Sequence, residues 1–266
     1  MTAVMQEVPP DLLGTEGAAM MRELARPGTL YVFDFDGTLA PMVAVPSQAL
    51  MRGRTELMIQ RLAEARPVAI LSGRGLDDLS HRVPSNVSWL VGNHGNEGLP
   101  GLPDDVAAEL STRFLTTCRD WIDQLEGEFD IESIWPGSVI EDKGVSLSLH
   151  YRHVPHPEIA EPAIREWLDN LKPVPRIIDG HQVFNLLPEG SVTKREAVIA
   201  LADVSECERV LFIGDDITDE FAFVDAPAHW ITVRVGVTSD TAARWRIDDQ
   251  SLIDAFLERL LAGLGL

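Results

Sequence analysis

Short apolar runs that end in polar loops and alternate with helical patterns constrain the fold of this chain most strongly. The runs lie at residues 30–35, 68–71, 89–92, 210–213 and 230–235, and they are typical of buried parallel strands. Helical patterns cover residues 18–25, 50–65, 194–201 and 250–261, with further helices starting at Leu76 and Asp219. We expect Ser72 to cap the helix at Leu76. Strands that alternate with helices predict a parallel, doubly wound sheet.

The pattern changes between residues 102 and 184. A long amphipathic helix at 107–126 precedes strand-like segments at 133–140 and 145–151, a helix at 162–171 and one or two strands within 176–187. Residues 145–151 alternate between apolar and polar, which predicts an antiparallel strand with one face in water. The sequence therefore predicts an α/β fold, in which a Rossmann-like doubly wound parallel sheet core (residues 1–101 and 185–266) carries an inserted α+β cap domain (residues 102–184).

Composition excludes several functions. The chain has 266 residues, ample for a buried core, and a formal net charge of -20. This charge disfavours binding to nucleic acids and docking on anionic lipid. The N-terminus lacks a signal-peptide pattern, and no segment approaches the roughly 20 apolar residues that span a membrane. We expect a cytoplasmic monomer in which Cys118 and Cys207 are ordinary thiols, with a disulfide as the alternative.

The loop after the first apolar run contains two carboxylates, Asp34 and Asp36, followed by Gly37 and Thr38. In an open parallel sheet the reactive site lies at the carboxyl ends of the strands. If the strand ends between the two carboxylates, both can face one centre, where one attacks phosphorus and the other transfers protons. An ordinary strand-ending Asp-Gly turn is the alternative interpretation.

Three further segments carry groups suited to an anion or a cation. The Ser72-Gly73-Arg74 loop offers a hydroxyl and backbone N–H groups to an anion. Lys194 starts a helix, where its charge opposes the helix dipole, and this suggests that it binds phosphate. Mg²⁺ would relieve the repulsion among four closely spaced carboxylates, Asp215, Asp216, Asp219 and Glu220. Singly, a common Ser-Gly turn, a solvated lysine and an acidic helix cap are the alternatives.

The order of these four segments resembles the four motifs of the haloacid dehalogenase superfamily of aspartate-based phosphatases, over most of residues 30–240. The resemblance implies that Asp34 is the nucleophile and forms an aspartyl-phosphate. It implies that Asp36 protonates the leaving oxygen and then activates water. Ser72, Gly73 and Lys194 would bind the phosphoryl oxygens. Mg²⁺ would be held by Asp34, the backbone carbonyl of Asp36, and Asp215, with Asp216 or Asp219.

Two other segments, residues 92–98 and 141–152, resemble trehalose-6-phosphate phosphatases. The resemblance implies that a small sugar phosphate is the substrate and that the sugar is contacted by Arg74, Asn93, His94, Glu97, Glu141, Lys143 and Asn185. A histidine satisfied within the core is the alternative for His94. Hydrolysis of trehalose 6-phosphate is the leading prediction. The alternatives are a phosphatase for another sugar or glycosyl phosphate, a mutase, and a non-enzymatic regulator that binds sugar phosphates.

The resemblance is incomplete near the end of the cap. The family usually has Glu-Val-Arg-Pro there, whereas this chain has Asn185 and Leu187 at the Glu and Arg positions. The preceding Lys is replaced by His181 or Gln182, and Arg195 follows Lys194 where Gly is usual. The catalytic set is therefore intact, while part of the sugar-binding set differs.

Overall fold

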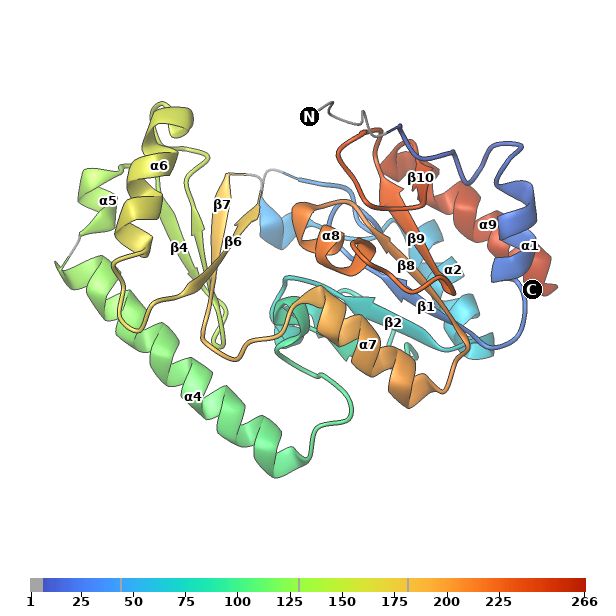
Figure 1. Cartoon of the computed structure of the whole chain (residues 1–266), viewed down its shortest axis with the longest axis horizontal. Helices are drawn as coiled ribbons and strands as arrows, with labels where there is room; N and C mark the ends of the chain where they lie inside the picture. Colours follow the sequence, from blue (N-terminus) through green and yellow to red (C-terminus); the bar gives the residue numbers. More distant parts are fainter. Residues whose placement is uncertain (1–6, 44, 129, 181) are drawn as a thin grey trace. The chain divides into compact units, whose positions relative to one another are not determined.

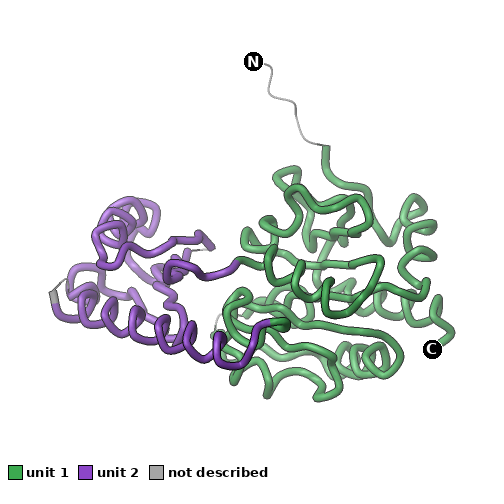
Figure 2. Tube along the Cα trace, turned by 60° about the horizontal axis from the view of Figure 1, so that its bottom comes forward, with its two compact units in different colours: residues 1–101, 193–266 green, residues 102–192 purple. Residues whose placement is uncertain are grey.

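The chain divides into two compact units, each with its own sheet. The computed structural model describes residues 7–43, 45–128, 130–180 and 182–266. Unit 1 comprises Met1–Gly101 and Thr193–Leu266, and unit 2 comprises Leu102–Val192 (Figure 2). The second boundary follows Val192 instead of residue 184, because the strand Val183–Leu187 pairs with strands of unit 2. His181, one of the predicted departures from the family, lies outside the described residues.

Unit 1 is built on a parallel sheet, which confirms the predicted fold class. Among the described residues its six strands run in the order β10-β9-β8-β1-β2-β3 (Figure 1). The strands are β1 (Thr29–Phe33), β2 (Val68–Leu71), β3 (Trp89–Val91), β8 (Arg209–Gly214), β9 (Trp230–Val235) and β10 (Trp245–Ile247). The chain order reverses between β1 and β8, which is the switch point where doubly wound sheets bind ligands. The sequence did not predict β10, because it is only three residues long and is not a continuous apolar run.

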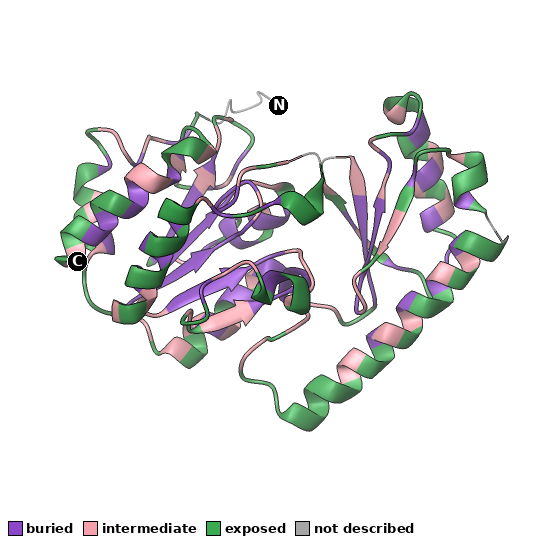
Figure 3. Cartoon of the chain, turned by 180° about the vertical axis from the view of Figure 1, so that it is seen from behind, coloured by how far each residue is buried: buried purple, intermediate pink, exposed green. Residues whose placement is uncertain are grey.

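Helices cover both faces of this sheet, which is why its central strands are buried on both sides (Figure 3). Side chains of β1 alternate, since Tyr31 and Phe33 belong to one core cluster and Leu30 and Val32 to the other. The first cluster contains residues of α1 (Ala18–Leu24), α2 (Gly53–Ala65), α3 (Leu76–Ser80) and α9 (Ile253–Leu264). The second contains residues of α7 (Lys194–Ser205) and α8 (Ile217–Phe223). Short 3₁₀ helices lie at Pro46–Gln48, Asn93–Gly95 and Gln250–Leu252.

Unit 2 has an antiparallel sheet with helices packed on one apolar face. Its described strands run in the order β4-β5-β7-β6, with bounds β4 (Val139–Asp142), β5 (Leu147–His150), β6 (Arg176–Gly180) and β7 (Val183–Leu187). The core cluster joins β5 and β7 to α4 (Asp104–Asp123) and α6 (Pro157–Leu168). A π-helical turn (Gln124–Glu128) and α5 (Ile131–Ile134) connect α4 to β4. The predicted α+β character of this unit agrees with the structure.

Several local predictions in unit 2 were wrong. The segment predicted as a strand at 133–140 contains the end of α5, and β4 starts only at Val139. The helix predicted at 162–171 begins at Pro157, because proline is well suited to the first turn of a helix. Ser146 and Ser148 were expected to face water but are buried. The Ser148 hydroxyl tolerates burial because it donates to Asn185 Oδ1 at 2.7 Å.

Two simpler predictions can be checked directly. Cys118 and Cys207 are free thiols, as expected. Among the described residues, no helix combines the length and the apolar character needed to cross a bilayer.

Candidate active site

A buried lysine joins two carboxylates at the switch point of the unit 1 sheet. Lys194 Nζ donates to Asp34 Oδ1 and to Asp219 Oδ1, both at 2.7 Å. All three residues are almost inaccessible to solvent, with exposed fractions of 2% for Lys194, 4% for Asp34 and 0% for Asp219. Asp34 directly follows β1, and its backbone N–H donates to Ile213 O of β8 at 2.9 Å. The structure therefore places two of the predicted residues, Asp34 and Lys194, in direct contact.

A third carboxylate, Asp215, completes the cluster from the end of β8. Its Oδ1 accepts a hydrogen bond from the Thr38 hydroxyl at 3.1 Å. Gly37 lies against the same carboxylate, since a Cβ on Gly37 would be 2.0 Å from Asp215 Oδ2. Gly37 also has a φ of 78°, which glycine adopts most readily. The loop after β1 thus needs glycine at this position for both its conformation and the space left to Asp215.

Capping boxes fix the starts of the two helices that carry Lys194 and Asp219. Thr193 caps α7 and bonds reciprocally with Glu196, which places Lys194 in the first turn. Asp216 caps α8 in the same way, and its backbone N–H donates to Asp219 Oδ2 at 2.9 Å. A capping box satisfies N–H groups that have no partner within the helix. Asp216, predicted as a metal ligand, is therefore engaged as a helix cap.

Burial and mutual repulsion shift the ionisation of the cluster. Burial raises the pKa of Asp34 well above its ordinary value, although Lys194 opposes the shift, and repulsion from Asp219 and Asp215 adds to it. Burial also raises the pKa of Asp215 to about 7, with repulsion from Asp219 and Asp216. Burial alone would lower the pKa of Lys194, but the carboxylates Asp219 and Asp34 raise it. The lysine is therefore charged at neutral pH.

This cluster fits a divalent cation by charge and by ligand type. Ligand oxygens of Asp34, Asp215 and Asp219 lie within 4.8 Å of one another. When all three carboxylates are ionised, they and the one ammonium group leave two negative charges in excess. A divalent ion balances that excess, and Mg²⁺ prefers oxygen ligands. Asp219 already uses Oδ1 for Lys194 and Oδ2 for two backbone N–H groups, which leaves Asp34 and Asp215 as the better ligands.

Asp36 lies in the loop after β1, and Arg74 from the loop after β2 holds it in a bidentate ion pair. Arg74 Nε donates to Asp36 Oδ2 at 2.6 Å, and Arg74 Nη2 donates to Asp36 Oδ1 at 2.7 Å. Arg74 Nη1 also donates to Asp78 Oδ2 at 2.7 Å. Arg74 was predicted to bind substrate; in this structure its guanidinium group orients Asp36 instead of being available to a sugar.

The loops after β2 and β3 bring together the remaining predicted residues of unit 1: Ser72, Gly73, Asn93, His94 and Glu97. Ser72 is buried, and its Oγ accepts from Arg74 N at 3.2 Å. The prediction that Ser72 caps α3 is wrong, because the capping position is occupied by Gly75.

The predicted residues of unit 2 share one face of its sheet. Glu141 pairs with Ser148, which pairs with Asn185, so these three form a row across β4, β5 and β7. Glu141 Oε2 lies 2.8 Å from His150 Nε2 and 3.9 Å from Lys143 Nζ. The opposite face packs into the unit 2 core. This face therefore carries charged and uncharged hydrogen-bonding groups, of which Ser148 and Asn185 are buried.

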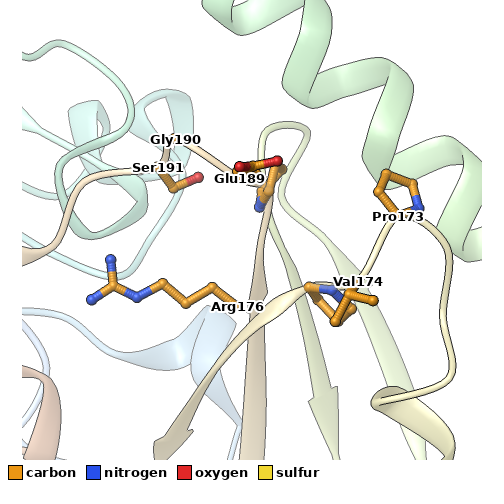
Figure 4. Close-up of a pocket in the computed structure, with 8 residues that line it drawn as sticks. Pro173, Val174, Arg176, Glu189, Gly190 and Ser191 are labelled. Atoms are coloured by element: carbon orange, nitrogen blue, oxygen red, sulfur yellow. The ribbon is translucent and has the colours of Figure 1, made fainter.

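A pocket elsewhere in unit 2 has few polar side chains in its lining (Figure 4). Its lining comes from residues 173–176 and 188–191, and its polar side chains are Arg176, Glu189 and Ser191. The candidate site residues all belong to the described parts of the chain, and none lines this pocket. We therefore do not assign this pocket to the candidate active site.

Sequence reasoning underrated two groups. Asp219 was left as an optional metal ligand, yet it is the second partner of Lys194. The Asp216-x-x-Asp219 spacing, a capping-box pattern, was the available signal. Thr38 was noted only as a nearby hydroxyl, and nothing in the sequence indicated that it would bond to Asp215, a residue far along the chain.

Comparison with known proteins identifies the family of the chain. The model of the trehalose-phosphatase family matches residues 32–251. Trehalose-phosphate phosphatases from Mycobacterium tuberculosis (strain H37Rv) and Mycobacterium leprae are 30% and 32% identical to the chain. Each alignment covers 94% of this chain, and the chain spans 65% and 61% of the length of these two relatives.

Two solved structures share the fold. A "trehalose-6-phosphate phosphatase related protein" has a TM-score of 0.71 at 23% identity, covering 89% of this chain and 100% of its own. The C-terminal domain of trehalose-6-phosphate phosphatase from C. albicans has a TM-score of 0.71 at 21% identity, covering 97% of this chain and 98% of its own. These two likenesses show that the chain shares the fold of the two structures. The chain belongs to the trehalose-phosphatase family.

Proposed function

We propose that this chain hydrolyses trehalose 6-phosphate to trehalose and phosphate, through an aspartyl-phosphate on Asp34 and with Mg²⁺ as cofactor. The observation that carries the proposal is the buried contact of Lys194 with Asp34 and Asp219, beside Asp215. It combines a nucleophile, a positive charge for phosphoryl oxygens and a set of oxygen ligands for a cation. The names of the relatives support the choice of substrate.

In this mechanism Asp34 attacks phosphorus, and the bond from phosphorus to the sugar oxygen breaks. Lys194 favours the ionised nucleophile and neutralises charge on the phosphoryl group. Asp36, two residues further on, would protonate the departing sugar oxygen and then take a proton from the attacking water. Asp36 must leave its ion pair with Arg74 to do so, because a carboxylate held by both oxygens cannot deliver a proton.

Mg²⁺ would be held by Asp34, Asp215 and the backbone carbonyl of Asp36, and when bound it would neutralise the charge that spreads over the transferring phosphoryl group. Asp219 would position Lys194 and the backbone at residues 215 and 216 through its two oxygens. Ser72 and the backbone of Gly73 would add donors to the phosphoryl oxygens. Asp216 remains a weaker candidate for the metal, since it caps α8.

The polar face of the unit 2 sheet would bind the sugar through Glu141, Lys143 and Asn185. One observation favours a second candidate, a phosphatase of another sugar phosphate or glycosyl phosphate. Asn185 replaces a carboxylate that is usual in the family, and its amide is already bonded to Ser148 Oγ at 2.7 Å and to Ile178 O at 3.4 Å. A sugar hydroxyl would have to compete with those internal partners.

A substrate panel separates the two candidates. Phosphate release is measured with Mg²⁺ from trehalose 6-phosphate, glucose 6-phosphate and other sugar phosphates at equal concentration. We expect the highest kcat/KM with trehalose 6-phosphate. If trehalose 6-phosphate is no better than glucose 6-phosphate, the specificity belongs to another sugar phosphate.

Replacing the nucleophile tests the chemistry independently of the sugar. Asp34→Asn should abolish phosphate release from every substrate, because an amide oxygen is a poor nucleophile. The fold should survive, since the substitution is isosteric and removes one of the repelling carboxylates. Circular dichroism and thermal unfolding provide the control. Persistent turnover in a folded Asp34→Asn variant would show that Asp34 is not the nucleophile.

A further inference from the structure

Glu97 completes the start of α3 from a neighbouring loop. Its Oε2 accepts a hydrogen bond from the backbone N–H of Leu76 at 2.6 Å. Leu76 is the first residue of α3, where N–H groups have no partner within the helix. The capping position is Gly75, which has no side chain to accept a bond. Glu97 therefore supplies, from 21 residues further along the chain, the acceptor that a capping side chain normally provides.

The backbone of the same loop is bonded to the 72–76 loop. Asn93 N donates to Arg74 O at 2.7 Å, and His94 N donates to Ser72 O at 2.9 Å. Asn93 and His94 are both left-handed, with φ values of 47° and 58°. This conformation is unfavourable for residues with side chains and persists where surrounding structure requires it. The backbone hydrogen bonds to Ser72 and Arg74 are such a requirement.

Side-chain packing joins the loops at Gly73. A Cβ on Gly73 would be 2.6 Å from His94 Cε1, so the buried imidazole ring lies directly against the Gly73 backbone. Glu97 is fixed at the base of this arrangement, because its backbone forms a bridge with Gly92 just after β3. The 92–97 loop thus supports the 72–76 loop through backbone hydrogen bonds and packing.

We propose that Glu97 is a positioning residue that holds the 72–76 loop in its phosphate-binding conformation, and that it does not contact the sugar. The inference rests on the proposed phosphatase function of the site. Its physical basis is that the carboxylate fixes the Leu76 N–H, and with it the direction of the chain that carries Ser72 and Gly73. Resemblance to the family implies a different role, a sugar contact.

The two roles differ in which substrates are affected. We would compare Glu97→Ala, Glu97→Gln and the matched control Asp77→Asn, which changes an exposed carboxylate next to Leu76. Each protein is assayed with Mg²⁺ on trehalose 6-phosphate and on para-nitrophenyl phosphate, which has no sugar. Binding of orthovanadate, a phosphate analogue, is measured by calorimetry, and thermal unfolding reports on the fold.

A positioning role predicts equal losses on both substrates. Glu97→Ala should lower kcat/KM by about tenfold to a hundredfold on each, because small displacements of binding groups are costly in catalysis. It should also weaken orthovanadate binding. Glu97→Gln should recover part of the loss, since its amide oxygen can accept from Leu76 N. Asp77→Asn should match the wild type throughout.

Other outcomes overturn the inference. A loss confined to trehalose 6-phosphate, with para-nitrophenyl phosphate and orthovanadate unaffected, would assign Glu97 to the sugar. The positioning role is also contradicted if Glu97→Ala leaves kcat/KM unchanged on both substrates. Failure of the wild type to prefer trehalose 6-phosphate would contradict the proposed function alone, because the para-nitrophenyl phosphate and orthovanadate measurements still report on the loop.

Discussion

At the scale of single residues, charge balance decides how the centre works. Lys194 is buried against two carboxylates, and among the described residues a third, Asp215, forms no ion pair with a lysine. The sequence could predict Asp34, Lys194 and Asp215, because each lies at the end of a strand or the start of a helix with a recognisable pattern. It could not predict which carboxylates would form ion pairs with Lys194, since that depends on the packing of α7 against α8.

The ionisation of Asp215 predicts how pH and Mg²⁺ affect stability. Its pKa in the folded protein, about 7, lies above the ordinary value of 3.8. The stability contributed by the protonated group is therefore fully present below the lower value and is lost as pH rises through the higher one. Mg²⁺ replaces the proton, so saturating Mg²⁺ should raise the melting temperature more at about pH 8 than at about pH 6.

Thermal unfolding with and without Mg²⁺ at the two pH values checks this prediction. Asp215→Asn serves as the matched control and should show a smaller response to Mg²⁺ at both. An equal or larger stabilisation by Mg²⁺ at the lower pH would contradict the assignment of Asp215 as a ligand that must lose its proton.

At the scale of elements, helix starts and strand ends position the candidate site residues. The apolar runs predicted the central strands well, because strands buried on both faces have little freedom in composition. The segment at 133–140 failed because a short helix and a short strand share a local pattern that only packing separates. The sequence also could not predict the hydrogen bond by which Glu97 supports α3, because this bond links loops that follow two different strands.

The capping box of α8 predicts a graded effect of substitutions at Asp216. Asp216→Ala should lower the free energy of unfolding by about 1 kcal/mol, the usual cost of losing a cap. Asp216→Asn should lower it less, because asparagine also caps helices well. Chemical denaturation measures both variants. If both variants instead lose Mg²⁺-dependent activity to the same large extent, Asp216 acts as a metal ligand and the capping role is secondary.

At the scale of the whole molecule, the division of labour follows the two units. Unit 1 carries the proposed nucleophile, Lys194 and the proposed cation ligands, whereas unit 2 carries the polar row of Glu141, Ser148 and Asn185. The sequence predicted the insertion from the change between parallel and antiparallel patterns. It misplaced the second boundary because β7 has the apolar composition of a core strand, and only its pairing assigns it to unit 2.

The most direct test of the central claim is to trap the phosphorylated residue. Protein turning over trehalose 6-phosphate with Mg²⁺ is quenched in acid and reduced with borohydride, which converts an aspartyl-phosphate to homoserine. Peptide mass spectrometry then locates the change. Our account predicts homoserine at position 34, dependent on substrate and Mg²⁺. Homoserine at another position, or phosphate release with Asp34 unmodified at every quench time, would contradict it.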